Sequence, residues 1–196
     1  MQLVFATNNK HKLIEAQSKL KDSGIEIISL EELGFNEEIE ETAETIEGNA
    51  IIKAECIFNK YNINVFADDT GLEVEALNGA PGVYSSRFAG LHVTYEDNVK
   101  KLLHDMQGKE NRLACFRTAI CLILDGKQHI FNGIVNGQII ESSVGEGGFG
   151  YDPVFIPDGF AQTFAELSLE TKNEISHRGR ALDELREFLQ GKIGKE

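Results

Sequence analysis

Residues 1–12 read MQLVFATNNKHK, and this stretch decides the fold class. Gln2 to Ala6 is a short apolar run, as expected of a buried strand, and apolar side chains recur at helical spacing from Lys10 onward. The polar residues between them form a loop at the carboxyl end of the strand and the amino end of the helix. A strand, a polar loop and a helix in this order indicate an α/β chain.

The rest of the chain extends this pattern and adds hairpins. Asp125-Gly126 fits a two-residue hairpin turn, and Asn136-Gly137 repeats that signal. Thr94 with Asp97 resembles a capping box at the start of a helix, and Gly191 suits the left-handed end of the last helix. Together the patterns predict strands at 2–6, 26–30, 65–67, 112–124, 127–135, 138–142 and 154–156, and helices from residue 10, around 46–61, at 94–106 and from 176 to Gly191.

Early helices between strands, followed by hairpins, predict a mixed sheet flanked by helices. We expect residues 1–196 to form a single two-lobed domain, because this length is enough to bury one sizeable core. A ligand is then expected in a central cleft between the two lobes.

The composition limits the partners of the chain. Its formal net charge of −13 opposes binding to a nucleic acid backbone, because lysine and arginine supply most of that affinity. A small polyanion remains compatible with this charge if a divalent cation screens it. The three cysteines Cys56, Cys115 and Cys121 lack metal-type spacing and fit buried apolar positions. No stretch has the features of a membrane span or a leader, so a cytoplasmic location is expected.

The loop Thr7-Asn8-Asn9-Lys10-His11-Lys12 is a candidate triphosphate cradle. Open α/β sheets bind ligands where a strand ends and a helix begins. Free backbone N–H groups, the positive end of the helix dipole, a hydroxyl and two lysines there suit an anion. Because the loop lacks the glycines and spacing of a P-loop, an ordinary strand-to-helix turn is the alternative.

A second candidate site is Ala67-Asp68-Asp69-Thr70-Gly71, in which two acids follow an apolar run. Adjacent carboxylates repel each other unless a cation lies nearby. Magnesium is typically held by one or two carboxylates, several waters and the oxygens of a substrate phosphate. An Asx-type turn in which Asp68 caps the local backbone is the alternative.

The acidic run before the helix around 46–61 offers further oxygen ligands. Most of its carboxylates are expected to be solvated or to start the helix, so only one or two are candidates. Lys53, on that helix, either reaches a phosphate or is a surface charge. The sequence leaves the metal ligands open among Glu38, Glu41, Asp68 and Asp69.

The segment Gly145-Glu146-Gly147-Gly148-Phe149-Gly150 matches the dinucleotide-binding pattern GxGxxG in form only. That motif has to open a helix, whereas Tyr151-Asp152-Pro153 and an apolar strand follow it here. The segment suits a base pocket better, because Phe149 offers an aromatic face and Asp152 an acceptor for ring N–H groups. A glycine-rich hairpin or bulge with a core aromatic is the alternative.

Lys172, His177 and Arg178 bring three basic groups to the start of the last predicted helix. Cations at a helix amino terminus oppose the helix dipole, so an anionic or electron-rich partner there would explain their presence. Simple surface charges are the alternative.

Five segments in order resemble the inosine triphosphatase family, also described as the non-canonical purine nucleoside triphosphate pyrophosphatases. The segments are TNNKHK at 7–12, GNAIIKA at 48–54, ADDTGLEVEALNGAPGVYSSRFAG at 67–90, GGFGYDP at 147–153 and SHRGRAL at 176–182. The chain departs from the family at Gly48, where an acid is usual, and at Thr70, where bacterial members commonly have serine. Threonine at this position has a hydroxyl group, as the serine of the bacterial members does.

The resemblance implies a magnesium-dependent hydrolase that converts ITP, dITP or XTP to the monophosphate and pyrophosphate. It also implies an elongated mixed α/β fold and a homodimer. It assigns magnesium to Glu41 and Asp69 and water activation to Asp69. It assigns substrate binding to Thr7, Asn8, Asn9, Lys10, His11, Lys12, Lys53, Thr70, Phe149, Gly150, Tyr151, Asp152, Lys172, His177 and Arg178. The rival interpretations are a Maf-like nucleotide pyrophosphatase and a non-catalytic nucleotide sensor.

Overall fold

The structure is a computed structural model that describes residues 1–193. Its helices are α1 (Lys10–Leu20), α2 (Leu30–Leu33), α3 (Ile46–Tyr61), α4 (Tyr95–Asp105), α5 (Leu169–Ile175) and α6 (His177–Ile193). Its strands are β1 (Gln2–Phe5), β2 (Glu26–Ser29), β3 (Val65–Val74), β4 (Pro81–Gly82), β5 (Leu113–Leu124), β6 (Lys127–Ile139) and β7 (Phe155–Pro157). Short 3-10 turns lie at Glu75–Leu77 (η1), Ser85–Arg87 (η2) and Asp152–Val154 (η3).

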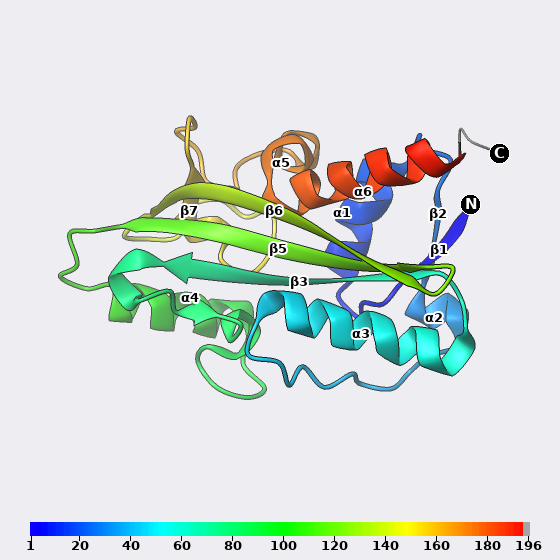
Figure 1. Ribbon diagram of the computed structural model, residues 1–196. Helices are drawn as coiled ribbons and strands as arrows, with labels where there is room; N and C mark the ends of the chain where they lie inside the picture. The colour runs from blue at the N-terminus through cyan, green and yellow to red at the C-terminus, as the bar shows by residue number, and fades with distance from the viewer. Residues whose placement is uncertain (194–196) are drawn as a thin grey trace.

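One mixed sheet organises the molecule, in the order β2-β1-β3-β5-β6-β7, with β4 paired to β3. β1 runs parallel to β2 and β3, whereas β3, β5, β6 and β7 pair antiparallel in succession. The long strands β3, β5 and β6 give the molecule its elongated shape (Figure 1). The predicted mixed sheet flanked by helices is confirmed.

Helices cover both faces of this sheet (Figure 1). On one face α3 packs against β3 and β5, and its fully buried Ala50 and Ala54 let the helix lie close to the strands. On the other face α1 and α6 cover a core that includes the stacked rings of Phe5 and Phe66. A third apolar cluster under α4, which includes the fully buried Leu102, closes the far end of the sheet.

Two predictions from short-range signals are confirmed. Asp125 and Gly126 both have positive φ, at 50° and 74°, and connect β5 to β6 as a two-residue turn. At the start of α4, the side chain of Thr94 accepts the backbone N–H of Asp97, and Asp97 reciprocates as in a capping box.

One turn prediction and one helix-end prediction are wrong. Asn136-Gly137 lies inside β6, where Asn136 pairs with Cys115 of β5. Gly137 is needed there because a Cβ atom would lie 2.2 Å from the carbonyl oxygen of Ile156 in β7. Gly191 does not end the last helix, since α6 continues to Ile193.

The remaining differences concern element boundaries. The strand predicted at 65–67 continues to Val74, so the two acids lie within β3 and the alternative of an Asx-type turn is wrong. The short helices α2 and α5 were not predicted. No helix within residues 1–193 combines the length and apolarity needed to cross a membrane.

Candidate active site

The candidate site lies at a gap in the edge of β3. β1 stops at Phe5, opposite Phe66, and β4 joins β3 only at Leu72 and Glu73. Asp68, Asp69 and Thr70 lie between these two pairings. The candidate phosphate loop, which follows β1, crosses the same gap and therefore lies beside the acids.

A cavity of about 700 Å³ opens at this gap, within the size range of small-molecule sites. Fifteen of the seventeen residues that the resemblance assigned line it, and only Lys10 and His11 do not. The fifteen are Thr7, Asn8, Asn9, Lys12, Glu41, Lys53, Asp69, Thr70, Phe149, Gly150, Tyr151, Asp152, Lys172, His177 and Arg178. The ring of His11 instead stacks on Phe149 at a centroid distance of 5.2 Å.

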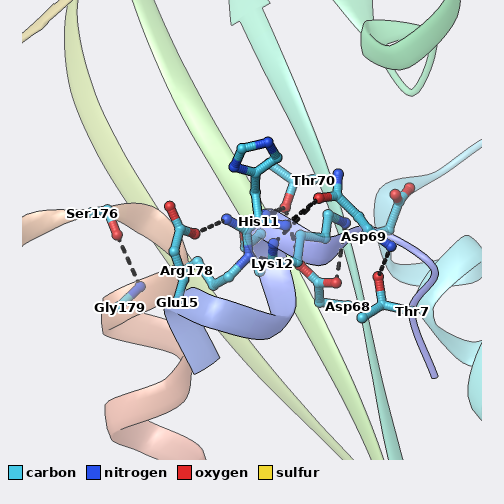
Figure 2. A network of polar contacts seen from close by, with 12 residues as sticks. Thr7, His11, Lys12, Glu15, Asp68, Asp69, Thr70, Ser176, Arg178 and Gly179 are labelled. Atoms are coloured by element: carbon cyan, nitrogen blue, oxygen red, sulfur yellow. Dashed lines mark hydrogen bonds and ion pairs between the residues drawn. The ribbon is translucent and has the colours of Figure 1, made fainter. Parts of the chain in front are cut away.

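Asp68 and Asp69 face opposite sides of the strand, because neighbouring side chains alternate along β3. The side chain of Asp68 points toward α1 and α6, where Lys12 Nζ donates to Oδ1 at 3.0 Å and Arg178 Nε donates to Oδ2 at 2.9 Å (Figure 2). Burial alone would raise the pKa of Asp68, but Lys12 and Arg178 hold it well below its usual range. Asp68 is therefore an ionised link between two basic groups.

Asp69 points toward α3 and the acidic run. Lys53 Nζ donates to Asp69 Oδ1 at 3.3 Å and to Glu41 Oε1 at 2.6 Å, and Asn49 Nδ2 donates to Asp69 Oδ2 at 3.2 Å. Burial raises the pKa of Asp69, and the carboxylates of Glu41 and Asp68 add to the shift against the effect of Lys53. A poorly compensated carboxylate of this kind is suited to accept a proton or a cation.

Glu41 and Asp69 are the two carboxylates that the resemblance assigns to magnesium, and their chemistry fits this role. Both approach the single ammonium of Lys53, so one cationic position is within reach of both. Within residues 1–193, no three His, Cys, Asp or Glu side chains gather closely enough to hold a metal by themselves. Two carboxylates completed by waters and substrate phosphate are nonetheless the donor set that magnesium commonly has in nucleotide enzymes.

The opposite end of the cavity is built around Glu15, a buried acid on α1. Its two oxygens accept from Lys172 Nζ at 2.7 Å and from Arg178 Nη1. Figure 2 shows Glu15 beside Arg178. Lys172 also donates to Asp152 Oδ2 at 2.6 Å, and Arg178 Nη2 donates to Thr70 Oγ1 at 3.1 Å. Lys172 and Arg178 thus have anionic partners inside the protein, and His177 is buried as well, so the interpretation of these three residues as surface charges is wrong.

Phe149 covers this end of the cavity. Lys172 Nζ lies 4.7 Å from the centroid of its ring, and the guanidinium of Arg178 lies 5.5 Å away. The loop is held by Asp152 Oδ2, which accepts the backbone N–H of Phe149 at 2.8 Å. Gly148 has a φ of +71°, and a Cβ atom there would lie 2.2 Å from the same carboxylate oxygen. Gly148 therefore makes room for Asp152, and the short 3-10 turn η3 rather than an α-helix follows the segment.

His177 forms part of the cavity wall between these two ends. It is buried, its ring stacks on Phe116 at 4.6 Å, and its Nδ1 has no hydrogen-bond partner within residues 1–193. Burial lowers the pKa of His177 well below its usual value, and Arg178 and Lys172 add to this shift. A neutral imidazole has one donor and one acceptor nitrogen, so it can serve either role toward a ligand.

Two glycines bring the start of α6 to the cavity. A Cβ atom on Gly133 of β6 would lie 1.9 Å from the carbonyl oxygen of His177, and one on Gly179 would lie 2.0 Å from the carbonyl oxygen of Asn173. Helix α6 therefore packs directly on β6 and on α5. This close packing sets the positions of His177 and Arg178.

The phosphate loop differs in one respect from the predicted cradle. Asn9 is the N-cap of α1, and its Oδ1 accepts the backbone N–H groups of His11 and Lys12 at 3.0 and 3.3 Å. The Thr7 hydroxyl accepts the N–H of Asn9 at 3.1 Å. These N–H groups are thus already bonded, and Lys12 is the main feature of the loop that can attract an anion.

Several residues of this site were not predicted from the sequence. Glu15 had a usable signal, since it is a lone acid on the apolar face of an amphipathic helix. Asn49 lies one helical turn before Lys53, on the same face of α3, so their spacing was also informative. Tyr95, Arg87 and the buried Thr118, whose hydroxyl lies 2.7 Å from that of Thr70, had no local signal.

Comparison with known proteins identifies the family. The model of the Ham1 family matches residues 3–188. The chain belongs to the Ham1 family. It is similar to the dITP/XTP pyrophosphatases of Flavobacterium psychrophilum, at 54% identity over 97% of this chain and 100% of the relative, and of Porphyromonas gingivalis, at 52% identity over 96% and 97%.

Solved structures of Ham1 proteins have the same fold. The Staphylococcus aureus Ham1 protein superposes with a TM-score of 0.88 at 40% identity, covering 98% of this chain and all of that one. The Coxiella burnetii HAM1 protein gives a TM-score of 0.89 at 39% identity, covering 97% and 99%. The family resemblance inferred from the five sequence motifs is confirmed.

Proposed function

We propose that this Ham1-family chain hydrolyses the triphosphates of non-canonical purines, ITP, dITP and XTP, to the monophosphate and pyrophosphate. The observation that carries the proposal is the division of one cavity into two ends. Glu41, Lys53 and Asp69 form a charged end, and Phe149, Lys172 and Arg178 form an aromatic and basic end. A nucleotide has the same division, with a phosphate chain at one end and a base at the other.

Asp69 acts on the attacking water. A water oxygen forms a bond to the α-phosphorus while the bond to the bridging oxygen of the β-phosphate breaks, and pyrophosphate leaves with that electron pair. Asp69 orients the water or accepts its proton, which the raised pKa of its carboxylate favours. No nucleophilic side chain is required, because positioning and electrostatic stabilisation dominate phosphoryl transfer.

Glu41 and Asp69 are the residues that would hold magnesium. Bound there, the metal would neutralise phosphate charge and polarise phosphate oxygens. Lys53 contacts both carboxylates and would be free to bind the phosphates if these carboxylates held a metal cation instead. Lys12 and Thr7 bind the phosphate chain from the loop after β1. Asp68 is excluded as a ligand in this proposal, because both its oxygens are engaged by basic residues on the other side of β3.

The base is read at the other end of the cavity. Arg178 uses three of its five N–H donors on Glu15, Asp68 and Thr70, which leaves two for a ligand. Donors favour the 6-keto group of hypoxanthine and xanthine over the 6-amino group of adenine, which has no acceptor at that position. Phe149 supplies a stacking surface that purines share, so the discrimination comes from the hydrogen bonds.

A nucleotide panel tests the proposal. ITP, dITP, XTP, GTP and ATP are each incubated with the protein and a divalent cation, and pyrophosphate and orthophosphate are measured separately. We expect pyrophosphate from ITP, dITP and XTP at much higher catalytic efficiency than from ATP. A Maf-like enzyme would prefer other bases, and a nucleotide sensor would bind without turnover; either result would refute the proposal.

A homodimer, a cytoplasmic location and a single two-lobed domain across residues 1–196 are further parts of this proposal. They rest on the family resemblance and on the length of the chain. Light scattering after size exclusion tests the dimer, for which a monomeric mass would be the contrary result.

A further inference from the structure

The cavity contains one basic residue that none of the five motif assignments uses. Five lysines and arginines line it. Lys12, Lys53, Lys172 and Arg178 each donate a hydrogen bond to at least one carboxylate. The guanidinium of the fifth, Arg87, donates no hydrogen bond within residues 1–193.

Arg87 lies at the charged end of the cavity. Its Nη1 atom is 3.7 Å from Glu41 Oε2, and the other oxygen of Glu41 accepts from Lys53. The guanidinium also lies over the ring of Tyr84, 5.2 Å from its centroid. Arg178, which binds Asp68 and Glu15, lies at the opposite end. A nucleotide whose base lies against Arg178 and whose α-phosphate lies at Asp69 therefore extends its outer phosphates toward Arg87.

The backbone that carries Arg87 is fixed by buried groups. The η2 turn begins at Ser85, whose hydroxyl accepts the N–H of Leu72 at 2.9 Å and whose carbonyl accepts the hydroxyl of Tyr151 at 2.8 Å. The carbonyl of Ser86 accepts from the buried Asn98 Nδ2 at 3.0 Å. An arginine with free donors on a turn held in this way is a preorganised anion site rather than a mobile surface charge.

We propose that Arg87 binds the pyrophosphate portion of the substrate and stabilises it as the leaving group. The inference rests on the proposed function. When the bond between the α-phosphorus and the bridging oxygen breaks, its electron pair stays on the pyrophosphate, which gains negative charge. The planar guanidinium can meet two phosphate oxygens at once, so Arg87 contributes more to the leaving pyrophosphate than to the bound monophosphate.

Binding of the two products separates this role from a structural one. The affinities of inorganic pyrophosphate and of IMP are measured by calorimetry, with magnesium present, for the wild type, Arg87→Gln and Arg87→Lys. We expect Arg87→Gln to weaken pyrophosphate binding by about 10- to 100-fold, the usual effect of losing a charge-assisted hydrogen bond. IMP binding should not change, and Arg87→Lys should recover part of the pyrophosphate affinity.

Arg117→Gln is the matched control, since Arg117 of β5 binds Glu73 of β3 and does not line the cavity. This control should bind pyrophosphate as the wild type does. Wild-type pyrophosphate affinity in Arg87→Gln, or an equal loss for pyrophosphate and IMP, would overturn the assignment of Arg87. Release of orthophosphate by the wild-type protein would instead overturn the proposed function, so the two failures are distinguishable.

Discussion

Asp68 and Asp69 are neighbours in the chain, yet their carboxylates bind different partners on opposite faces of β3. Asp68 accepts from Lys12 and Arg178, whereas Asp69 accepts from Lys53 and Asn49. The gap between the end of β1 and the start of β4 exposes the edge of β3 at this point. Both side chains can therefore serve one cavity, one by positioning basic groups and the other by acting on the substrate.

The two acids are expected to respond differently to neutralisation. The pKa of Asp68 is lowered by the fold, so its ionised form stabilises the folded state at every pH above its unfolded value. Asp68→Asn should lower the free energy of unfolding by about 3 kcal/mol, as when one partner of a buried ion pair is removed. The pKa of Asp69 is raised, so neutralising it should cost little stability.

Asp69→Asn should consequently leave a folded protein with greatly reduced turnover, because it keeps the shape but removes the ligand and base. Urea denaturation and turnover of ITP are measured for both variants. Near-normal turnover in Asp69→Asn would remove this residue from its catalytic role, and equal stability losses in the two variants would contradict the distinction between them.

Activity should require an added divalent cation. Glu41 and Asp69 lie close together with only Lys53 between them, and a triphosphate brings further negative charge. Turnover of ITP is followed in excess chelator and again after magnesium is restored. Turnover that persists undiminished in chelator would contradict this prediction and show that the lysines and Arg87 neutralise the phosphate charge without a metal.

Base discrimination should depend on Arg178 more than on Lys12. Arg178→Ala removes donors at the base end, so the ratio of catalytic efficiencies for ITP and ATP should fall by at least about tenfold. Lys12→Ala acts on the phosphates that both nucleotides share and should lower both efficiencies similarly.

Thermal denaturation shows whether each of these variants is folded, since both residues are paired with the buried Asp68. Arg178→Lys, which keeps the charge without the forked donors, is measured as well. If all three variants kept the wild-type ratio, base reading would have to be assigned to other groups, such as the backbone of the loop at Phe149.

Close packing of α6 on β6 should be needed for activity. Gly133→Ala places a methyl group against the carbonyl of His177, which should lower the free energy of unfolding by about 1–3 kcal/mol and raise KM for ITP. Gly191→Ala is the matched control, because a Cβ atom there meets no other atom within 4 Å. Its stability should stay unchanged or rise by up to about 1 kcal/mol. An unaltered KM for ITP in Gly133→Ala would show that this close packing is not needed for activity.

Sequence patterns predicted the parts of the fold that depend on local interactions. The turn at Asp125-Gly126 and the cap at Thr94 need only neighbouring residues, so their signals were sufficient. Asn136-Gly137 has the same local signal as a turn but lies in β6, because pairing with β5 and the approach of β7 outweigh it. The strand β3 was predicted too short, since its charged pair interrupts an apolar run and the side chains that bind the two carboxylates come from other elements of the fold.

The candidate site was predicted as a set of residues rather than as a geometry. The motifs brought Lys172 and Arg178 together near the last helix, but their shared partner Glu15 lies more than 150 positions away in the chain, on α1. The opposite orientations of Asp68 and Asp69 follow from strand alternation only once both are known to lie within β3. Arg87 gave no local signal, because its relation to Glu41 depends on how η2 folds back over the cavity.

The destination of the attacking oxygen tests the central claim most directly. ITP is hydrolysed by the wild-type protein in water labelled with a heavy oxygen isotope, and the products are analysed by mass spectrometry. Attack at the α-phosphorus predicts unlabelled pyrophosphate and one labelled oxygen in IMP. Label in pyrophosphate, or release of labelled orthophosphate with IDP, would contradict the account.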